Sequence, residues 1–182
     1  MMNLKKLSDI QITLDERIKQ QHPIKEGEDR FSKKLLALLV ELGECANEQR
    51  SWKFWSNNQN PCLNRTQHDF YSGDVIREYN PLLEEYIDNL HFILSLGREI
   101  NINIPNEYKR EWMIKEKDIV DHFLAVFSLA SRFGITKSET DFNLTLDTFM
   151  GLGEMLGFTW EEIEASYYEK NEINHGRQND NY

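Results

Sequence analysis

Apolar residues recur along most of the chain at steps of three and four positions, which places them on one side of an α-helix. The first such stripe covers residues 4–18, and Pro23 closes it. A second helical pattern covers residues 29–50, and its centre, residues 35–40, is apolar on every side. Because a helix that is apolar all round has to be surrounded by neighbours, we expect this one at the buried centre of the fold.

Sequence signals for helix ends define the next elements. Asn80 before Pro81 predicts a helix start, because asparagine caps the first amide groups and proline suits the first helical position. The helical pattern then continues to about Arg98. The polar segment 57–73 has no stable period and is expected to be a loop, and we expect no strand or hairpin from the pattern.

The C-terminal part of the chain predicts three more helices. The first covers residues 117–132 and stops at Gly134, and the second covers residues 138–156. The last begins at Thr159, where Glu162 completes a capping box. These patterns together predict an all-α fold, a single-domain helical bundle with a central buried helix.

The composition fits one globular domain that spans residues 1–182. Hydrophobic residues make up 40% of the chain, and no apolar run reaches the length of a membrane span, so a membrane is not an expected partner. The N-terminus has no apolar signal core and the two cysteines indicate a reducing compartment, which predicts a cytoplasmic protein. The net charge of −10 disfavours nucleic acid and favours cations, or ligands carried by cations.

Acidic residues continue the most apolar helix of the chain. Glu41, Glu44 and Glu48 fall within a wedge of roughly 60° on this helix. Burying ionised carboxylates costs free energy unless they are paired or bound to a metal. A second acidic cluster lies early in the helix that begins at Pro81. It consists of Glu84, Glu85 and Asp88.

If the two acidic helices pack antiparallel, four carboxylates converge and repel one another strongly. Mg²⁺ relieves such repulsion, because it prefers hard oxygen ligands and binds through carboxylates plus substrate phosphates. The pattern therefore suggests a Mg²⁺-dependent enzyme that acts on a phosphate ester or anhydride. Zinc is not expected, because the cysteines and histidines lack ligand spacing. In the simpler interpretation, the acids are only the solvated faces of amphipathic helices.

Aromatic and basic residues follow these helices. Trp52-Lys53-Phe54-Trp55 comes directly after the second helix and either closes one end of the core or stacks on a nucleotide base. Lys170, Asn174 and Arg177 are spaced i, i+4 and i+7, so they form one polar stripe if the last helix persists. That stripe either binds phosphate oxygens or simply complements the helix dipole.

Taken together, these segments resemble the dimeric, all-α dUTPase family (dUTP diphosphatases), which belongs to the all-α nucleoside-triphosphate pyrophosphatase superfamily with the MazG-like enzymes. Glu-x-x-Glu paired with Glu-x-x-Asp is typical of the superfamily, whereas the tryptophan and C-terminal motifs are more specific to the dUTPase branch. The matching pieces are Glu41-Leu42-Gly43-Glu44, Trp52-Lys53-Phe54-Trp55, Glu85-Tyr86-Ile87-Asp88 with His91-Phe92, residues 156–163, and Lys170-Asn171-x-x-Asn174-x-x-Arg177-Gln178.

The resemblance implies Mg²⁺-dependent hydrolysis of dUTP, in which water attacks the α-phosphorus and releases dUMP and pyrophosphate. It also implies dUDP as a further candidate substrate and a homodimer. Glu44 is the first candidate to orient or deprotonate the water, followed by Glu41. The implied Mg²⁺ ligands are Glu41, Glu44, Glu85 and Asp88.

The same resemblance implies the substrate contacts. Lys170 and Arg177 would bind phosphates, and Asn174 would contact the nucleotide near its base or sugar. Gln11 of the first helix is the candidate for recognition of uracil. The expected walls of the base and deoxyribose pocket are His91, Phe92 and Trp55. The expected substrate-binding set is completed by Trp52, Lys53 and Asn171.

Two alternatives to dUTP hydrolysis remain open at the level of sequence. A related pyrophosphatase acting on another nucleotide, such as dCTP, would share the acidic helices and differ in its pocket residues. A non-catalytic helical protein with a binding or regulatory role would carry the acids only as solvated surface.

Overall fold

The computed structural model describes residues 3–104, 108–109 and 116–179, and within these ranges the chain forms six helices and one two-stranded sheet. The helices account for most of the described residues, which confirms the predicted all-α fold. They are α1 (Leu4–Gln21), α2 (Arg30–Gln49), α3 (Pro81–Glu99), α4 (Ile119–Thr136), α5 (Glu139–Met155) and α6 (Trp160–Asn179).

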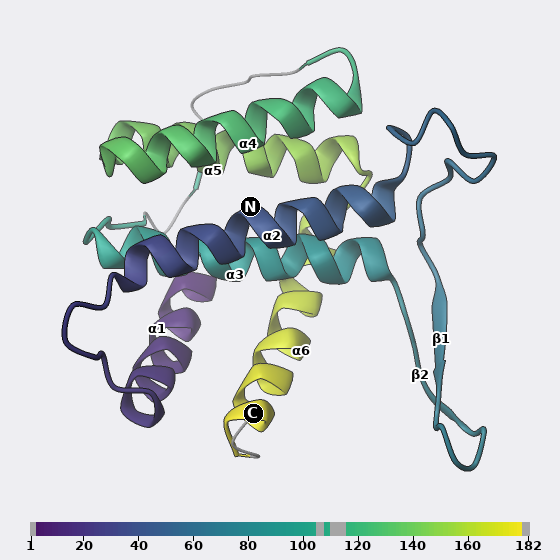
Figure 1. The fold of residues 1–182 in the computed structure, drawn as a ribbon, viewed down its shortest axis with the longest axis horizontal. Coiled ribbons are helices and arrows are strands. Elements are labelled where there is room, and N and C mark those ends of the chain that lie inside the picture. The colour runs from purple at the N-terminus through teal and green to yellow at the C-terminus, as the bar shows by residue number, and fades with distance from the viewer. Residues whose placement is uncertain (1–2, 105–107, 110–115, 180–182) are drawn as a thin grey trace.

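The helices lie in three layers (Figure 1). α4 and α5 pack on each other in one layer, α2 and α3 form the middle layer, and α1 and α6 pack on α3 from the other side. α2 and α3 run in opposite directions, because the segment between them brings the chain back along α2. This antiparallel pair places the C-terminal half of α2, with its acidic motif, beside the N-terminal half of α3.

The central buried helix is α3 rather than α2. α3 packs against α1, α2, α5 and α6, and side chains such as Leu90 and Leu94 are fully buried. On α2, Leu36 is 64% exposed and Val40 is 50% exposed, so the prediction of an α2 buried all round is wrong. The apolar residues of α2 pack against α3 and α4, and an apolar strip that includes Leu36 and Val40 stays uncovered in the single chain.

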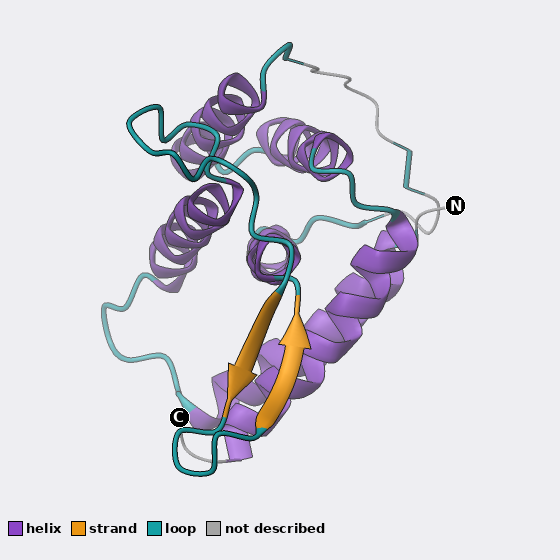
Figure 2. Ribbon diagram, turned by 90° about the vertical axis from the view of Figure 1, so that its right-hand side faces the viewer, coloured by secondary structure: helices purple, strands orange, loops and turns teal. Residues whose placement is uncertain are grey.

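Part of the segment expected to be a loop belongs to a β-hairpin (Figure 2), which lies apart from the helices at one end of the molecule (Figure 1). β1 (Arg65–His68) pairs antiparallel with β2 (Val75–Tyr79). The expectation of no strand is therefore wrong here. All four side chains of β1 are exposed, so the sequence lacks the apolar–polar alternation that reveals a half-buried strand.

The predicted helix caps are present at α3 and α6. The Asn80 side chain accepts a hydrogen bond from the Leu83 amide at the start of α3. Before α6, the Thr159 amide donates to the Glu162 carboxylate, and the Glu162 amide donates to the Thr159 hydroxyl. These caps satisfy amide groups that have no partner inside the helix, which explains why both helices begin where the sequence predicted.

α4 continues past its predicted end at Gly134 and reaches Thr136. Gly134 does not end the helix. It lets α4 pack closely on α2, because a Cβ atom there would lie 2.1 Å from the Leu35 side chain. The helix ends at Lys137, which adopts a left-handed conformation with φ of 49°. A glycine chosen for helix contact cannot be distinguished from a helix stop by local sequence alone.

α4 is also, within the described ranges, the one helix with the length and mean hydropathy of a membrane span, with a mean hydropathy of 1.3. One such helix is a weak indication of a membrane protein, because the core helix of a soluble protein has the same properties. Here α4 packs along α5 and against α2, which accounts for a part of its apolar surface.

Candidate active site

Three carboxylates from α2 and α3 converge where the two helices run antiparallel. Oxygen atoms of Glu41, Glu44 and Glu85 lie within 4.8 Å of one another. Glu41 and Glu44 are about one turn apart on α2, and Glu85 faces them from the beginning of α3. The structure thus brings together three of the four predicted ligands, at the place that antiparallel packing predicts.

Asp88, the fourth predicted ligand, is held beside the cluster by Lys170 of α6. The Nζ atom of Lys170 lies 2.6 Å from Asp88 Oδ2 and 2.9 Å from Glu84 Oε1. Glu84 also pairs with Arg77 of β2 at 3.1 Å. Lys170 is itself buried, so one positive charge is fixed at the edge of the acidic cluster.

The electrostatics of the cluster favour a cation. Burial, together with repulsion from Asp88 and Glu44, raises the pKa of Glu41 to about 7. Burial and the charges of Asp88, Glu41 and Glu44 raise the pKa of Glu85 to about 8. Carboxylates that retain protons near neutral pH lack compensating positive charge, and a divalent cation supplies it. The oxygen-only donor set on two packed helices fits Mg²⁺.

A cleft of about 670 Å³ opens beside the acids, between α1, α2, α3 and α6. It extends from the acidic cluster to the polar residues of α1, so residues far apart in the sequence share one cavity. The predicted site residues that line it are Gln11, Glu41, Asp88, His91, Phe92, Asn174 and Arg177.

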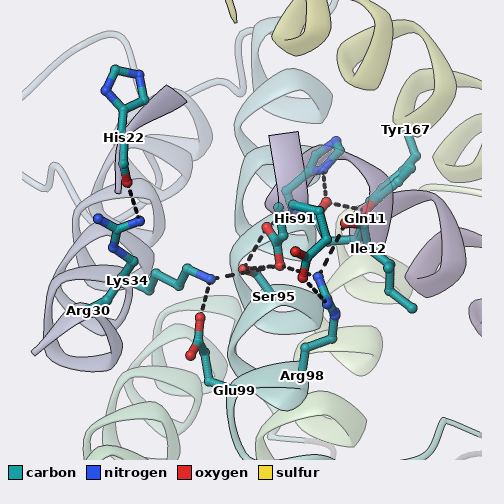
Figure 3. A network of polar contacts seen from close by, with 12 residues as sticks. Gln11, Ile12, His22, Arg30, Lys34, His91, Ser95, Arg98, Glu99 and Tyr167 are labelled. Carbon is teal, nitrogen blue, oxygen red and sulfur yellow. Dashed lines mark hydrogen bonds and ion pairs between the residues drawn. The ribbon is translucent and has the colours of Figure 1, made fainter. Parts of the chain in front are cut away.

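Gln11 belongs to a buried hydrogen-bond network in this cleft (Figure 3). Its Oε1 atom lies 2.7 Å from Nδ1 of His91 and accepts a hydrogen bond from the Tyr167 hydroxyl, also at 2.7 Å. Its Nε2 atom donates to Asp15 at 2.9 Å. His91 stacks on Tyr167 with ring centroids 3.8 Å apart. Burial and the charge of Lys170 lower the pKa of His91 to about 3, so its ring is neutral at physiological pH.

The Trp52–Trp55 segment lies after the C-terminal end of α2, outside this cleft. The indole N–H of Trp52 donates to the Ala46 carbonyl at 2.9 Å, and Trp52 lines a second groove between α2 and α4. Trp55 is 64% exposed and packs edge-on against Trp52. The structure does not bring Trp55 to the other expected walls of the base pocket, so substrate contact by Trp52, Lys53 and Trp55 stays a prediction.

α6 remains helical as far as Asn179, so the predicted polar stripe forms. Asn174 and Arg177 face the cleft. Burial raises the pKa of Asp88 above its ordinary value, and the positive charges of Lys170 and Arg177 oppose this rise. Asn171 is buried, and its Nδ2 atom has no hydrogen-bond partner within the described part of the chain. The stripe therefore supplies cationic and amide groups on the side of the cleft opposite α2.

Two residues of this site have roles that the sequence did not predict. Asp15 lies four positions after Gln11, a spacing that places both on one face of α1 and was the available signal. Glu84 is recognisable in the sequence only as another acid. Its role depends on Arg77 and Lys170, and Arg77 comes from a hairpin that the sequence pattern does not reveal.

The fold and the site together define the class: an all-α protein whose antiparallel acidic helices border a cleft suited to a phosphate-bearing ligand and a cation. A family model described as dUTPase matches residues 3–182. The chain therefore belongs to the all-α dUTPase family and is a hydrolase of the dUTP diphosphatase type. No curated protein matches the chain.

Proposed function

We propose that this enzyme hydrolyses dUTP to dUMP and pyrophosphate in a Mg²⁺-dependent reaction, with water attacking the α-phosphorus. The main support is the convergence of Glu41, Glu44 and Glu85 within 4.8 Å of one another at the helix pair. This donor set suits a divalent cation that also binds substrate phosphates. We expect dUDP, which carries the same base and sugar, to be a second substrate.

Each carboxylate has a proposed task. Mg²⁺, when bound by these groups, would neutralise the cluster and stabilise the negative charge that spreads over the triphosphate. We assign the orientation of the attacking water to Glu44, because its side chain is exposed while one of its oxygens stays within the cluster. Glu41 is the second candidate for this task. The proposed ligands are Glu41, Glu44, Glu85 and Asp88.

The nucleotide contacts follow from the lining of the cleft. Lys170 is already fixed beside Asp88, so it can meet a phosphate without first losing side-chain freedom. Arg177 provides a second phosphate contact, and Asn174 contacts the nucleotide near its base or sugar. Gln11 recognises the base. The proposed pocket walls on α3 are His91 and Phe92.

We also infer that the enzyme is a cytoplasmic homodimer that pairs through the groove between α2 and α4. This groove has a volume of about 570 Å³ and a largely apolar lining. Exposed apolar surface of this kind marks an interaction site, and paired identical surfaces are the commonest arrangement. Both cysteines are free, in keeping with a reducing compartment. The main apolar lining residues are Val40, Val120, Phe123, Leu124 and Phe127.

A product assay tests the proposed reaction. Purified protein is incubated with each nucleoside triphosphate, in Mg²⁺ and in EDTA, and the products are separated. Selective release of pyrophosphate from dUTP in Mg²⁺ alone supports the proposal. Release of orthophosphate, or turnover in EDTA, contradicts the mechanism. Preferential hydrolysis of dCTP supports the other nucleotide specificity, and binding without turnover supports a non-catalytic role.

A further inference from the structure

We propose that Asp15 is a positioning residue for base specificity. It fixes the side-chain amide of Gln11 so that Gln11 can only donate a hydrogen bond into the cleft. Such a donor selects a pyrimidine with a carbonyl group at the contacted edge over one with an amino group. This inference rests on the proposed dUTP hydrolysis and names the residues that make the cleft select its base.

The carboxylate of Asp15 is surrounded by donors. Arg98 donates to Oδ2 at 3.1 Å, and the Ser95 hydroxyl donates to the same oxygen at 2.8 Å (Figure 3). Lys34 Nζ lies 3.8 Å from Oδ2. A carboxylate paired with these cations only accepts hydrogen bonds. The nitrogen of the Gln11 amide, rather than its oxygen, must therefore face Asp15.

The opposite side of the Gln11 amide is then determined. Its oxygen faces His91 and Tyr167, each at 2.7 Å, and both must donate to it. Burial and the charge of Asp15 raise the pKa of Tyr167 above its ordinary value, so the hydroxyl keeps its proton. His91 is neutral and therefore carries its single ring hydrogen on Nδ1. Its Nε2 atom has no partner within the described ranges.

These contacts leave Gln11 with one hydrogen-bonding group. The oxygen already accepts two hydrogen bonds and one Nε2 hydrogen goes to Asp15, so within the described part of the chain only the second Nε2 hydrogen lacks a partner. Gln11 lines the cleft that holds the acids. An N–H donor pairs with the O4 carbonyl of uracil and opposes the N4 amino group of cytosine. A polar group that faces a like group in a buried site strongly disfavours the mismatched base.

The isosteric substitution Asp15→Asn tests this arrangement. Arg98 and Lys34 will hold the new amide oxygen where Oδ2 was, so the new NH₂ group will face Gln11. Gln11 can satisfy it only by rotating its own amide, which turns Nε2 towards His91 and Tyr167. The hydroxyl can accept instead of donating, and His91 can move its hydrogen to Nε2. Gln11 would then present an acceptor to the base.

Two readouts follow from the rotation. The ratio of kcat/KM for dUTP to that for dCTP should fall by about tenfold or more, because one hydrogen bond changes from matched to opposed. In the protein without substrate, the ring ¹⁵N shifts of His91 should change from the Nδ1–H to the Nε2–H pattern. The matched control is Asp9→Asn, an exposed residue of the same helix paired with Lys5, which should change neither readout.

A folded Asp15→Asn variant with an unchanged ratio and an unchanged His91 pattern would overturn the inference, as would equal loss of activity on both nucleotides. If that variant does not fold, Tyr167→Phe removes one donor to the Gln11 oxygen without changing the ring, and the ratio should fall by about threefold. An unchanged ratio in the Tyr167→Phe variant overturns the inference as well.

The wild-type enzyme distinguishes this inference from the proposed function. A wild-type enzyme without preference for dUTP contradicts the proposed function, whereas the ring ¹⁵N shifts of His91 still report the orientation of the Gln11 amide.

Discussion

Glu44 is the residue on which the proposed chemistry depends most. We expect Glu44→Gln to lower kcat by about 10²-fold or more, because it removes a charge that orients water and binds the cation. The melting temperature should stay equal or rise slightly, since one repulsive charge leaves the cluster. Steady-state kinetics and thermal unfolding measure the two effects.

The matched control for this substitution is Glu48→Gln. Glu48 lies about one turn further along α2 and pairs with Arg65 at 2.9 Å, outside the three-carboxylate cluster. Its loss should leave kcat within about twofold, since Glu48 lies outside the three-carboxylate cluster and its ion-pair partner Arg65 is 43% exposed to solvent. Equal activity of the Glu44 and Glu48 variants would mean that the cluster does not carry the reaction.

The raised pKa values of Glu41 and Glu85 predict how stability depends on pH without Mg²⁺. A carboxyl group whose pKa is higher in the folded than in the unfolded state stabilises the fold at low pH, and this contribution is lost as pH rises through the folded pKa. Here that loss begins above the ordinary carboxyl pKa and is complete once the pH has passed the folded pKa values of about 7 for Glu41 and about 8 for Glu85. In EDTA, the free energy of unfolding should therefore fall by about 1–3 kcal/mol between about pH 6 and about pH 9.

Chemical denaturation across this pH range checks the prediction. The double substitution of Glu41 and Glu85 by Gln should remove most of the slope. Added Mg²⁺ should stabilise the protein more at the alkaline end, because it then binds ionised carboxylates. A wild-type stability that does not change with pH would show that burial and repulsion do not raise the pKa values of these two acids in the folded protein.

At the scale of the element, the packing of α5 on α3 holds the acidic helix in place. Gly153 of α5 lies against the buried ring of Tyr86, and a Cβ atom there would be 2.5 Å from the Tyr86 hydroxyl oxygen. We expect Gly153→Ala to lower the free energy of unfolding by about 1–3 kcal/mol through overpacking. Denaturant titration measures this change.

Gly176 offers the opposite case on α6. No heavy atom lies within 4 Å of a Cβ built there, so Gly176→Ala gains helix propensity without a clash. We expect a gain of up to about 1 kcal/mol. If Gly153→Ala stabilises the protein as much as Gly176→Ala does, the contact with Tyr86 does not exclude a larger side chain at position 153.

At the scale of the whole molecule, the uncovered apolar strip on α2 and α4 predicts a dimer. Val40 is 50% exposed and Leu124 is 61% exposed, and both line the groove. Replacing both by Glu should shift the protein from dimer to monomer, because negative charges without a partner would be buried at the apolar contact. Light scattering after size-exclusion chromatography gives the mass of each species.

Phe70→Glu provides the control for this double variant. Phe70 is 92% exposed in the turn between β1 and β2 and does not line the groove, so this variant should remain dimeric. Dissociation by the Phe70 substitution, with the groove variant still dimeric, would place the contact on the hairpin instead. A monomeric wild-type protein would contradict the dimer itself.

Local signals in the sequence were sufficient for most of the secondary structure. The caps at Asn80 and Thr159 involve residues within one turn, so their hydrogen bonds can be inferred from neighbouring positions. The hairpin could not be inferred, because β1 and β2 are short and largely exposed and carry no apolar alternation. The burial of α2 depends on helices that are distant in the sequence. A prediction from its apolar composition alone therefore overestimated how much of α2 is buried.

The acidic residues of the site were recognisable in the sequence, because the helical repeat fixes which positions share a face. The three-residue spacing from Glu41 to Glu44 therefore places both side chains on the same side of α2. Only the tertiary structure decided that Glu85 joins them, that Lys170 is held between Glu84 and Asp88, and that Asp15 orients Gln11. Those relations join residues from separate helices, and the angle and register at which helices pack are set by the whole core rather than by any local repeat.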